Sequence, residues 1–151
     1  MGIAITFIAI GLVIAYGIWA KVRWNNEVSA VLPLYLLGIS VMCLHFLEEY
    51  LTGFQRAFPT LIGYQWSDQK FVSFNLLWLA IFILAAIGIY RGIAVAYLIV
   101  IFFVFIGGIG NGIGHILLTL ATGRYFPGLG TSSLLLIIGI MLWRRLFRKA
   151  D

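Results

Sequence analysis

Charged residues are scarce in this sequence, and their scarcity excludes most classes of soluble protein. Only 10% of the 151 residues are charged, whereas 63% are hydrophobic, and the mean hydropathy is +1.08. A soluble domain of this size needs a polar exterior, which such a composition cannot supply. We therefore expect residues 1–151 to form one integral membrane domain, with room for about five spans of roughly 20 residues each.

The sequence also has little cysteine and no basic segment at its start. Cys43 is the single cysteine, so an intramolecular disulfide is excluded and the compartment cannot be read from cysteine usage. The first three residues contain no basic side chain, and Lys21 and Arg23 follow the first apolar run. This order argues against a cleaved signal peptide and predicts that the first helix is retained.

The basic residues do not gather into a patch mixed with polar surface, as a nucleic-acid-binding protein would require. The net charge is +5, but these residues lie at the ends of apolar stretches. Five stretches are long enough to cross a bilayer as helices, at residues 3–19, 30–51, 71–90, 93–121 and 129–147. The predicted fold is an all-α bundle of five transmembrane helices, whose partner is the lipid bilayer and not a nucleic acid.

The orientation of this bundle is predicted from the uneven distribution of its basic residues. One end collects seven of them, which are Lys21, Arg23, Arg91, Arg144, Arg145, Arg148 and Lys149. The other end collects three, which are Arg56, Lys70 and Arg124. Because basic residues accumulate on the cytoplasmic side of a membrane, the N-terminus is expected outside and the C-terminus in the cytoplasm.

The connection between the second and third apolar stretches, residues 52–70, is long for a small bundle. Its aromatic residues are Phe54, Phe58, Tyr64 and Trp66. Aromatic side chains gather at membrane interfaces. The segment is therefore expected at the outer interface, either as a loop with a short amphipathic turn or as a lid over a site beneath it.

The few polar residues inside the apolar stretches gather in one place. The chain has five acidic residues and two histidines, and the turn from His45 to Glu49 holds three of those seven. A charged group near the bilayer centre costs about 2.5–3.5 kcal/mol on insertion scales, so such residues usually mark a site. The second histidine, His115, follows Asn111 by four residues in the fourth apolar stretch.

Polar residues of three helices are predicted to share one depth. The second and fourth helices both run outward, and at ~1.5 Å per residue their polar groups lie roughly 5–15 Å below the outer end. Asn75, near the start of the inward-running third helix, lies at the same level. Five residues of the fourth helix fall on one face, which we expect to pack against the second helix: Gly107, Gly110, Asn111, Gly114 and His115.

Three motifs in this order resemble the HXXEE family of small bacterial membrane proteins. They are His45-x-x-Glu48-Glu49, the separate His115, and Tyr125-Phe126-Pro127-Gly128. The resemblance spans residues 45–128 and implies a multi-pass protein of the cell membrane, the bacterial inner membrane. It implies no reaction, because the family has no assigned biochemical function. His45 and Glu49 also resemble the His-x-x-x-Glu motif of the five-helix emopamil-binding sterol isomerases, although the rest of the chain does not align.

Each of these residues also has a purely structural interpretation. Glutamates near a helix end can reach interfacial water, and a single histidine or asparagine on a packing face often only bridges helices. Independent structural roles do not predict a shared depth and a shared facing, so a functional site is favoured. We expect four residues to be catalytic: His45, Glu48, Glu49 and His115. Four more are expected to bind the substrate or to support the catalytic residues: Asn75, Asn111, Tyr125 and Thr131.

Two chemistries suit this set of side chains. Two neighbouring carboxylates cannot both ionise cheaply in a low-dielectric cavity, so one would hold a proton while the other pairs with a histidine. Alternatively, His45, Glu49 and His115 would bind one divalent metal, zinc rather than iron, with one position open for water. The sequence leaves both alternatives open.

The leading hypothesis is a small membrane-embedded enzyme that acts on a lipophilic substrate through this acid–base site, with or without a metal. The reaction would be of the isomerase, cyclase or hydrolase type. The alternative is a proton- or cation-coupled transporter, which would need a polar path through the inner half of the bundle. Between the outer layer and the basic residues at the inner end, the third, fourth and fifth helices carry no charge, which favours the enzyme.

Overall fold

The apolar stretches of the sequence are helices in the computed structural model, which describes residues 2–21, 28–63 and 66–147. Within these ranges the chain forms helices and no strand. Their bounds are α1 (Gly2–Trp19), α2 (Val28–Thr52), α3 (Phe54–Leu61), α4 (Asp68–Tyr90), α5 (Ala96–Phe102), η1 (Phe103–Gly110), α6 (Asn111–Thr122) and α7 (Leu129–Leu146). The helix η1 is a π-helix that joins α5 to α6 without a break.

Four helices of the described chain are long and apolar enough to cross a membrane. They are Val31–Thr52 within α2, Asp68–Tyr90, the continuous segment Ala96–Thr122, and Leu129–Leu146. The described apolar part of α1, Ile8–Trp19, is shorter. The chain is thus an all-helical membrane protein with four candidate spans, and the helix bounds lie within a few residues of the apolar stretches seen in the sequence.

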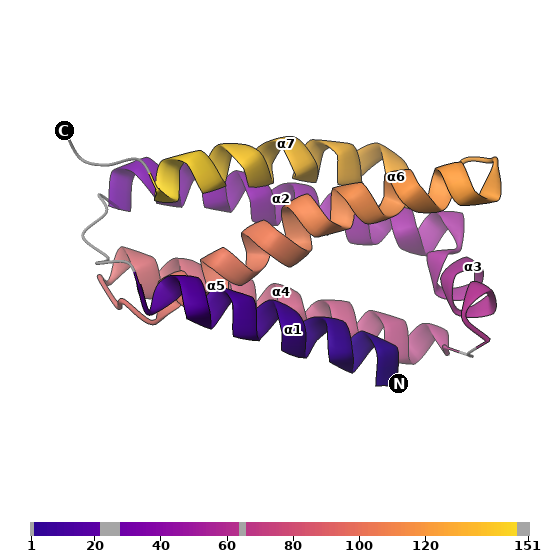
Figure 1. Ribbon diagram of the computed structural model, residues 1–151, viewed down its shortest axis with the longest axis horizontal. Coiled ribbons are helices and arrows are strands. Elements are labelled where there is room, and N and C mark those ends of the chain that lie inside the picture. The colour runs from indigo at the N-terminus through magenta and orange to yellow at the C-terminus, as the bar shows by residue number, and fades with distance from the viewer. Residues whose placement is uncertain (1, 22–27, 64–65, 148–151) are drawn as a thin grey trace.

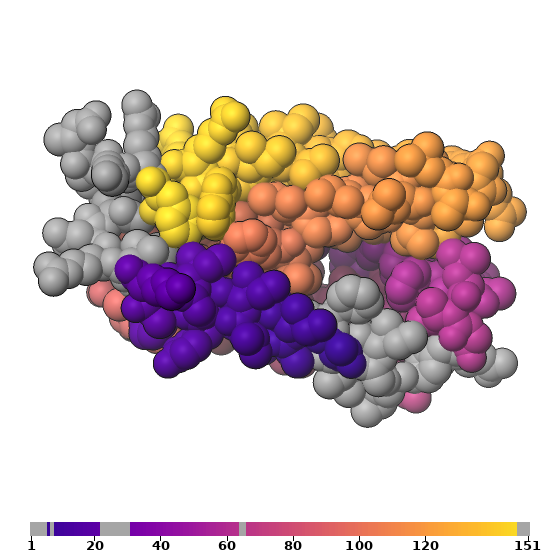
Figure 2. Space-filling view, viewed as in Figure 1, coloured from indigo at the N-terminus to yellow at the C-terminus, as the bar shows by residue number. Residues whose placement is uncertain are grey.

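The long helices run side by side and alternate in direction, so the two ends of the chain lie at opposite ends of the bundle (Figure 1). Helix α2 packs against α7 and α4, while α7 packs against η1 and α6. Helix α1 lies against α5. Figure 2 shows that the surface is hollowed between α1, the η1–α6 segment and α3.

The basic residues divide between the two ends as the sequence predicts. The end at which α1, α4 and α7 finish carries Lys21, Arg91, Arg144 and Arg145, and the end with α3 carries Arg56, Lys70 and Arg124. Three further residues of the orientation argument, Arg23, Arg148 and Lys149, lie outside the described residues, as does the aromatic Tyr64.

The π-helix changes which residues of the fourth span face its neighbours. A π-turn takes more residues than an α-turn, so counting about 100° per residue loses the correct phase across η1. The structure brings Gly108 and Gly112 against α7, and a Cβ added to Gly114 would meet nothing within 4 Å. The predicted shared face was wrong for Gly110, which is exposed, and for Gly114. Gly114 directly precedes His115 in α6 and points about 100° away from it around the helix, so this angle, and not η1, explains the second error. The span packs chiefly on α7 rather than on α2.

A close contact joins the backbones of η1 and α7. A Cβ added to Gly108 would lie 2.9 Å from the Cα atom of Gly139 and 3.1 Å from the carbonyl oxygen of Leu135. Small residues allow membrane helices to approach this closely, and the contact then gains van der Waals and weak hydrogen-bond energy. This approach holds α7 beside the span that carries His115.

We predict that Gly108→Ala lowers the free energy of unfolding by about 1–3 kcal/mol, because the added methyl group must push two backbones apart. Gly114→Ala is the matched control in the same span and should be neutral or slightly stabilising, since alanine favours a helix more than glycine does. Thermal unfolding of the detergent-solubilised variants measures both. Equal midpoints for the two variants would contradict the proposed close contact.

Candidate active site

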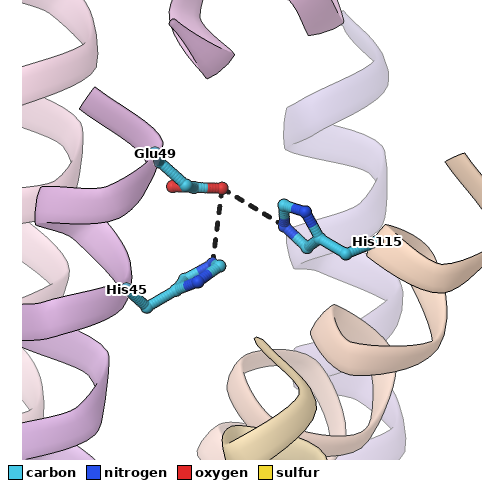
Figure 3. A group of neighbouring side chains, drawn as sticks. All are labelled: His45, Glu49 and His115. Atoms are coloured by element: carbon cyan, nitrogen blue, oxygen red, sulfur yellow. Dashed lines mark ion pairs between the residues drawn. The ribbon is translucent and has the colours of Figure 1, made fainter. Parts of the chain in front are cut away.

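Two histidines and one glutamate meet in the interior of the bundle. His45 and Glu49 lie one turn apart on α2, so their side chains project from the same face, and His115 reaches them from α6 (Figure 3). Glu49 Oε1 is 3.4 Å from His45 Nε2 and 3.3 Å from His115 Nε2. The three residues are only 3%, 6% and 3% exposed for His45, Glu49 and His115.

Glu48 points away from this group and binds the start of α7. Its carboxylate accepts hydrogen bonds from the backbone N–H groups of Gly130, at 3.0 Å, and Thr131, at 2.8 Å. The hydroxyl groups of Tyr125 and Thr131 also donate to it. Helix α7 begins after Gly128, which has no side chain to cap it. Glu48 thus supplies the N-terminal cap of α7 from another helix, where a negative charge also suits the helix dipole.

The two adjacent glutamates therefore do not share one cavity, in contrast to the expected pair of competing carboxylates. Consecutive residues on a helix are about 100° apart, and here that angle sends Glu48 to α7 and Glu49 to the histidines. Each carboxylate has its own set of partners. The like-charge repulsion expected from the sequence is reduced by this separation.

Thr131 links the two glutamate sites through His45. Its hydroxyl group has one hydrogen, which it donates to Glu48, so its oxygen must accept from His45 Nδ1, 2.9 Å away. This assignment places the proton of neutral His45 on Nδ1 and leaves a lone pair on Nε2. Asn111 Nδ2 lies 2.8 Å from that Nε2 atom and donates to it. His45 is thus held on both ring nitrogens with Nε2 directed at Glu49.

Gly128 packs directly on the buried group. A Cβ added there would lie 2.6 Å from His115 Cε1 and 2.9 Å from both His45 Cε1 and Glu49 Cγ. Its φ of 91° also lies in the left-handed region that favours glycine. The Tyr-x-Pro-Gly motif therefore serves the site in two ways, because Tyr125 contacts Glu48 while Gly128 contacts all three buried residues.

Aromatic residues close the site at the end of the bundle that carries α3. The Phe54 ring of α3 lies 5.4 Å from the ring of His115 and 5.9 Å from that of Phe126, measured between centroids. His115 Nδ1 is buried and has no hydrogen-bond partner among the described residues. The sequence left the segment that contains α3 either as a loop with a short amphipathic turn or as a lid over a site, and in the structure α3 places Phe54 against His115.

A cavity of about 210 Å³ leads from the buried group into the bundle. Its polar lining consists of His45, Glu49, Asn75 and Asn111. Its aromatic lining consists of Phe54, Trp66, Phe71, Phe74, Trp78, Phe82 and Phe102. The stacked rings of Trp78 and Phe102, 4.7 Å apart, form part of the wall. An apolar cavity lined by a few polar groups is the usual form of a small-molecule site.

The remaining predicted site residues occupy supporting positions. Asn75 lines the cavity, and its side chain donates to the carbonyl of Phe71 in its own helix. The phenol of Tyr125 lies in the connection before α7, where burial and then its bond to Glu48 raise the pKa of Tyr125, so that it stays a donor at neutral pH. Sequence reasoning missed Gln55, whose buried Oε1 has no partner. Its polar type in an aromatic segment was the available signal.

Comparison with known proteins identifies a family and no individual relative. A family described as proteins of unknown function with an HXXEE motif matches residues 36–142. The chain belongs to this family, since the match covers most of its length. The matched range includes the motif residues His45, Glu48 and Glu49 and also the separate His115. No curated protein matches the chain, and no solved structure matches it.

We predict that Glu48→Ala lowers the free energy of unfolding by about 1–2 kcal/mol or more, because two backbone N–H groups of α7 lose their cap. The stability of Glu48→Gln should fall between that of Glu48→Ala and that of the unchanged protein, because its amide keeps one accepting oxygen but loses the negative charge. Thermal unfolding in detergent ranks the three proteins. If Glu48→Ala unfolds at the temperature of the unchanged protein, the capping role is wrong.

A second prediction concerns Gly128. Gly128→Ala should disturb the buried group, because a methyl group there overlaps all three side chains and strains a backbone with positive φ. The matched control is Gly123→Ala, which has a similar positive φ of 63° but nothing within 4 Å of the added Cβ. We expect the NMR signals of selectively labelled histidine to shift in the first variant and not in the second. Unchanged histidine signals in Gly128→Ala would contradict the packing.

Proposed function

We propose that this protein is a small membrane-embedded enzyme that moves a proton on a lipophilic molecule held in the aromatic cavity. The observation that carries the proposal is that aromatic rings and three polar side chains, those of His45, Glu49 and Asn111, line the same cavity. Aromatic walls favour an apolar substrate, and the polar side chains supply acid–base groups. The reaction would be of the isomerase, cyclase or hydrolase type.

The burial of these groups supports a functional role over a structural one. Ionisable side chains inside a membrane protein are expensive, and they are kept where they act on a substrate or a proton. The carboxylate of Glu48 caps α7 from α2 without any contribution from Glu49 or His115, so these two residues are not needed for the cap. Their interaction with each other does not by itself recover the cost of desolvation.

The hydrogen bonds assign roles to individual atoms. The lone pair of His45 Nε2 accepts a proton from the substrate, and the chain from His45 Nδ1 through Thr131 to Glu48 stabilises the imidazolium that forms. Glu49 Oε1 lies 3.4 Å from the same nitrogen and relays the proton toward His115 or back to the substrate. Asn111 and Asn75 offer hydrogen bonds that orient a polar group of the substrate.

Transport of protons or cations is the competing function, and the distribution of buried polar groups argues against it. Among the described residues, the buried histidine, glutamate, glutamine and serine side chains are His45, Glu49, Gln55, His115 and Ser132. All lie toward the end of the bundle that carries α3. The buried hydroxyl of Tyr35, which lies near the start of α2 and away from this end, donates to the carbonyl of Phe82. A proton path across the bilayer would need further groups in that half.

The proposal includes a membrane topology. Helix α1 would be the fifth span, with the N-terminus outside and the C-terminus in the cytoplasm, as the seven-to-three division of basic residues favours. The site then lies in the outer half of the bilayer. A lipophilic substrate would reach it from the membrane through the hollow between α1, the η1–α6 segment and α3 (Figure 2).

We predict that Glu49→Gln and His45→Ala abolish turnover, with a loss of at least about 100-fold, because proton transfer typically contributes 10²–10⁴-fold. Membranes containing each protein are incubated with lipid extract in D₂O, and lipids are analysed by mass spectrometry. The unchanged protein should produce a lipid that carries deuterium on carbon or a changed mass. Asp68→Asn removes a carboxylate from the exposed Arg56–Asp68 pair and should retain activity.

Two results would decide against the enzyme. Lipid profiles that are identical for the unchanged protein and Glu49→Gln would remove the proton-transfer role. A proton flux in reconstituted vesicles that Glu49→Gln abolishes would instead favour the transporter. Folding of each variant is checked by its thermal midpoint, so that loss of activity is separated from loss of structure.

A further inference from the structure

The distances within the buried group do not match hydrogen bonds between charged partners. A protonated histidine and a carboxylate usually approach to about 2.7–2.9 Å. Here Glu49 Oε1 stands 3.4 Å from His45 Nε2 and 3.3 Å from His115 Nε2. All three ligand-type atoms lie within 4.8 Å of one another. The side chains surround a point rather than joining in pairs.

We propose that His45 Nε2, Glu49 Oε1 and His115 Nε2 bind one divalent metal ion, and that this ion is zinc. In tetrahedral coordination with bonds of about 2.0–2.1 Å, two ligand atoms are about 3.3–3.4 Å apart. Both measured separations equal this edge length. An octahedral site with the same bonds would bring neighbouring ligands to about 2.9 Å, so the tetrahedral metal fits better than iron in a facial triad.

The hydrogen bonds around His45 prepare it as a ligand. Its proton is on Nδ1, held by Thr131 and through it by the carboxylate of Glu48, so Nε2 carries a lone pair, whose present partner is the amide of Asn111. Zinc-bound histidines commonly donate the other ring nitrogen to an outer carboxylate or carbonyl in this way. Two neutral imidazoles and one carboxylate are ligand types that zinc accepts, and the ion would offset the buried negative charge.

Asn111 defines the fourth position. Its amide nitrogen lies 2.8 Å from His45 Nε2, the atom that would hold the metal. Amide nitrogen and oxygen are assigned from hydrogen bonding, and a half-turn of the amide presents Oδ1 to the ion instead. Of the two histidines, the glutamate and the asparagine, three residues line the cavity: His45, Glu49 and Asn111. The fourth ligand is therefore Asn111 or a water molecule on the cavity side, which a substrate oxygen can replace.

A metal at this position indicates which class of substrate the proposed enzyme would accept. This part of the inference rests on the proposed function. A zinc ion with a position open to the cavity polarises a carbonyl or activates a bound hydroxyl group or water. The aromatic walls accept an apolar chain or ring system. The substrate is then a lipophilic molecule that carries one oxygen function, with that oxygen at the metal and the hydrocarbon part among the aromatic rings.

The direct test is the metal content of the full-length protein, purified in detergent without chelator and with any polyhistidine tag removed. Elemental analysis should find about one zinc per chain. His115→Ala and Glu49→Gln should each lose at least four-fifths of it, whereas the surface variant Asp68→Asn should retain it. A thermal midpoint for each variant shows whether it is folded. Zinc added after treatment with chelator should raise the midpoint of the unchanged protein but not that of His115→Ala.

Cobalt(II) provides a second readout that does not depend on what the protein carries when purified. After treatment with chelator, cobalt titration should give the intense visible absorption of a tetrahedral ion, saturating at one equivalent and absent in Glu49→Gln. Protein that is folded but takes up neither zinc nor cobalt overturns the proposal. Lipid conversion by such metal-free protein would still support proton transfer, whereas stoichiometric zinc without any lipid change would support the metal site and count against the enzyme.

Discussion

The attachment of Glu48 to the first turn of α7 is the interaction on which the rest of the site depends. In a membrane, backbone N–H groups that find no partner inside the protein are costly, and α7 has no side chain of its own at its cap position. Glu48 satisfies two of these groups from α2. The same contact fixes Thr131 beside His45 and brings Gly128 against the buried histidines and Glu49.

The two adjacent glutamates have different surroundings. Glu48 is surrounded by four donors and ties two helices together. Glu49, one position later, turns into the interior, where its known partners are two histidines at distances too long for strong hydrogen bonds. A group arranged in this way is open to an additional participant, whether a proton, a metal or a substrate. Thr131 connects the two parts, so the orientation of His45 depends on the helix cap.

Much of the fold follows from hydropathy, and the family follows from three short motifs. The apolar stretches at 71–90 and 129–147 correspond closely to α4 and α7. The common depth of His45, Glu49 and His115 followed from helix direction and rise, and the three residues meet. Helix phase was less predictable. Across η1 the assumption of a uniform α-helix failed, and the glycines that contact α7 are Gly108 and Gly112.

The sequence by itself determined that the chain is an all-helical membrane protein and that its polar residues gather near one end, because hydropathy and helix rise are local properties. It also determined that His45 and Glu49 share a face, since four residues make about one turn. Only the tertiary structure decided that Glu48 caps α7, that Thr131 sets the tautomer of His45, and that Phe54 covers His115. These contacts join segments up to 86 positions apart, and their geometry depends on how whole helices pack.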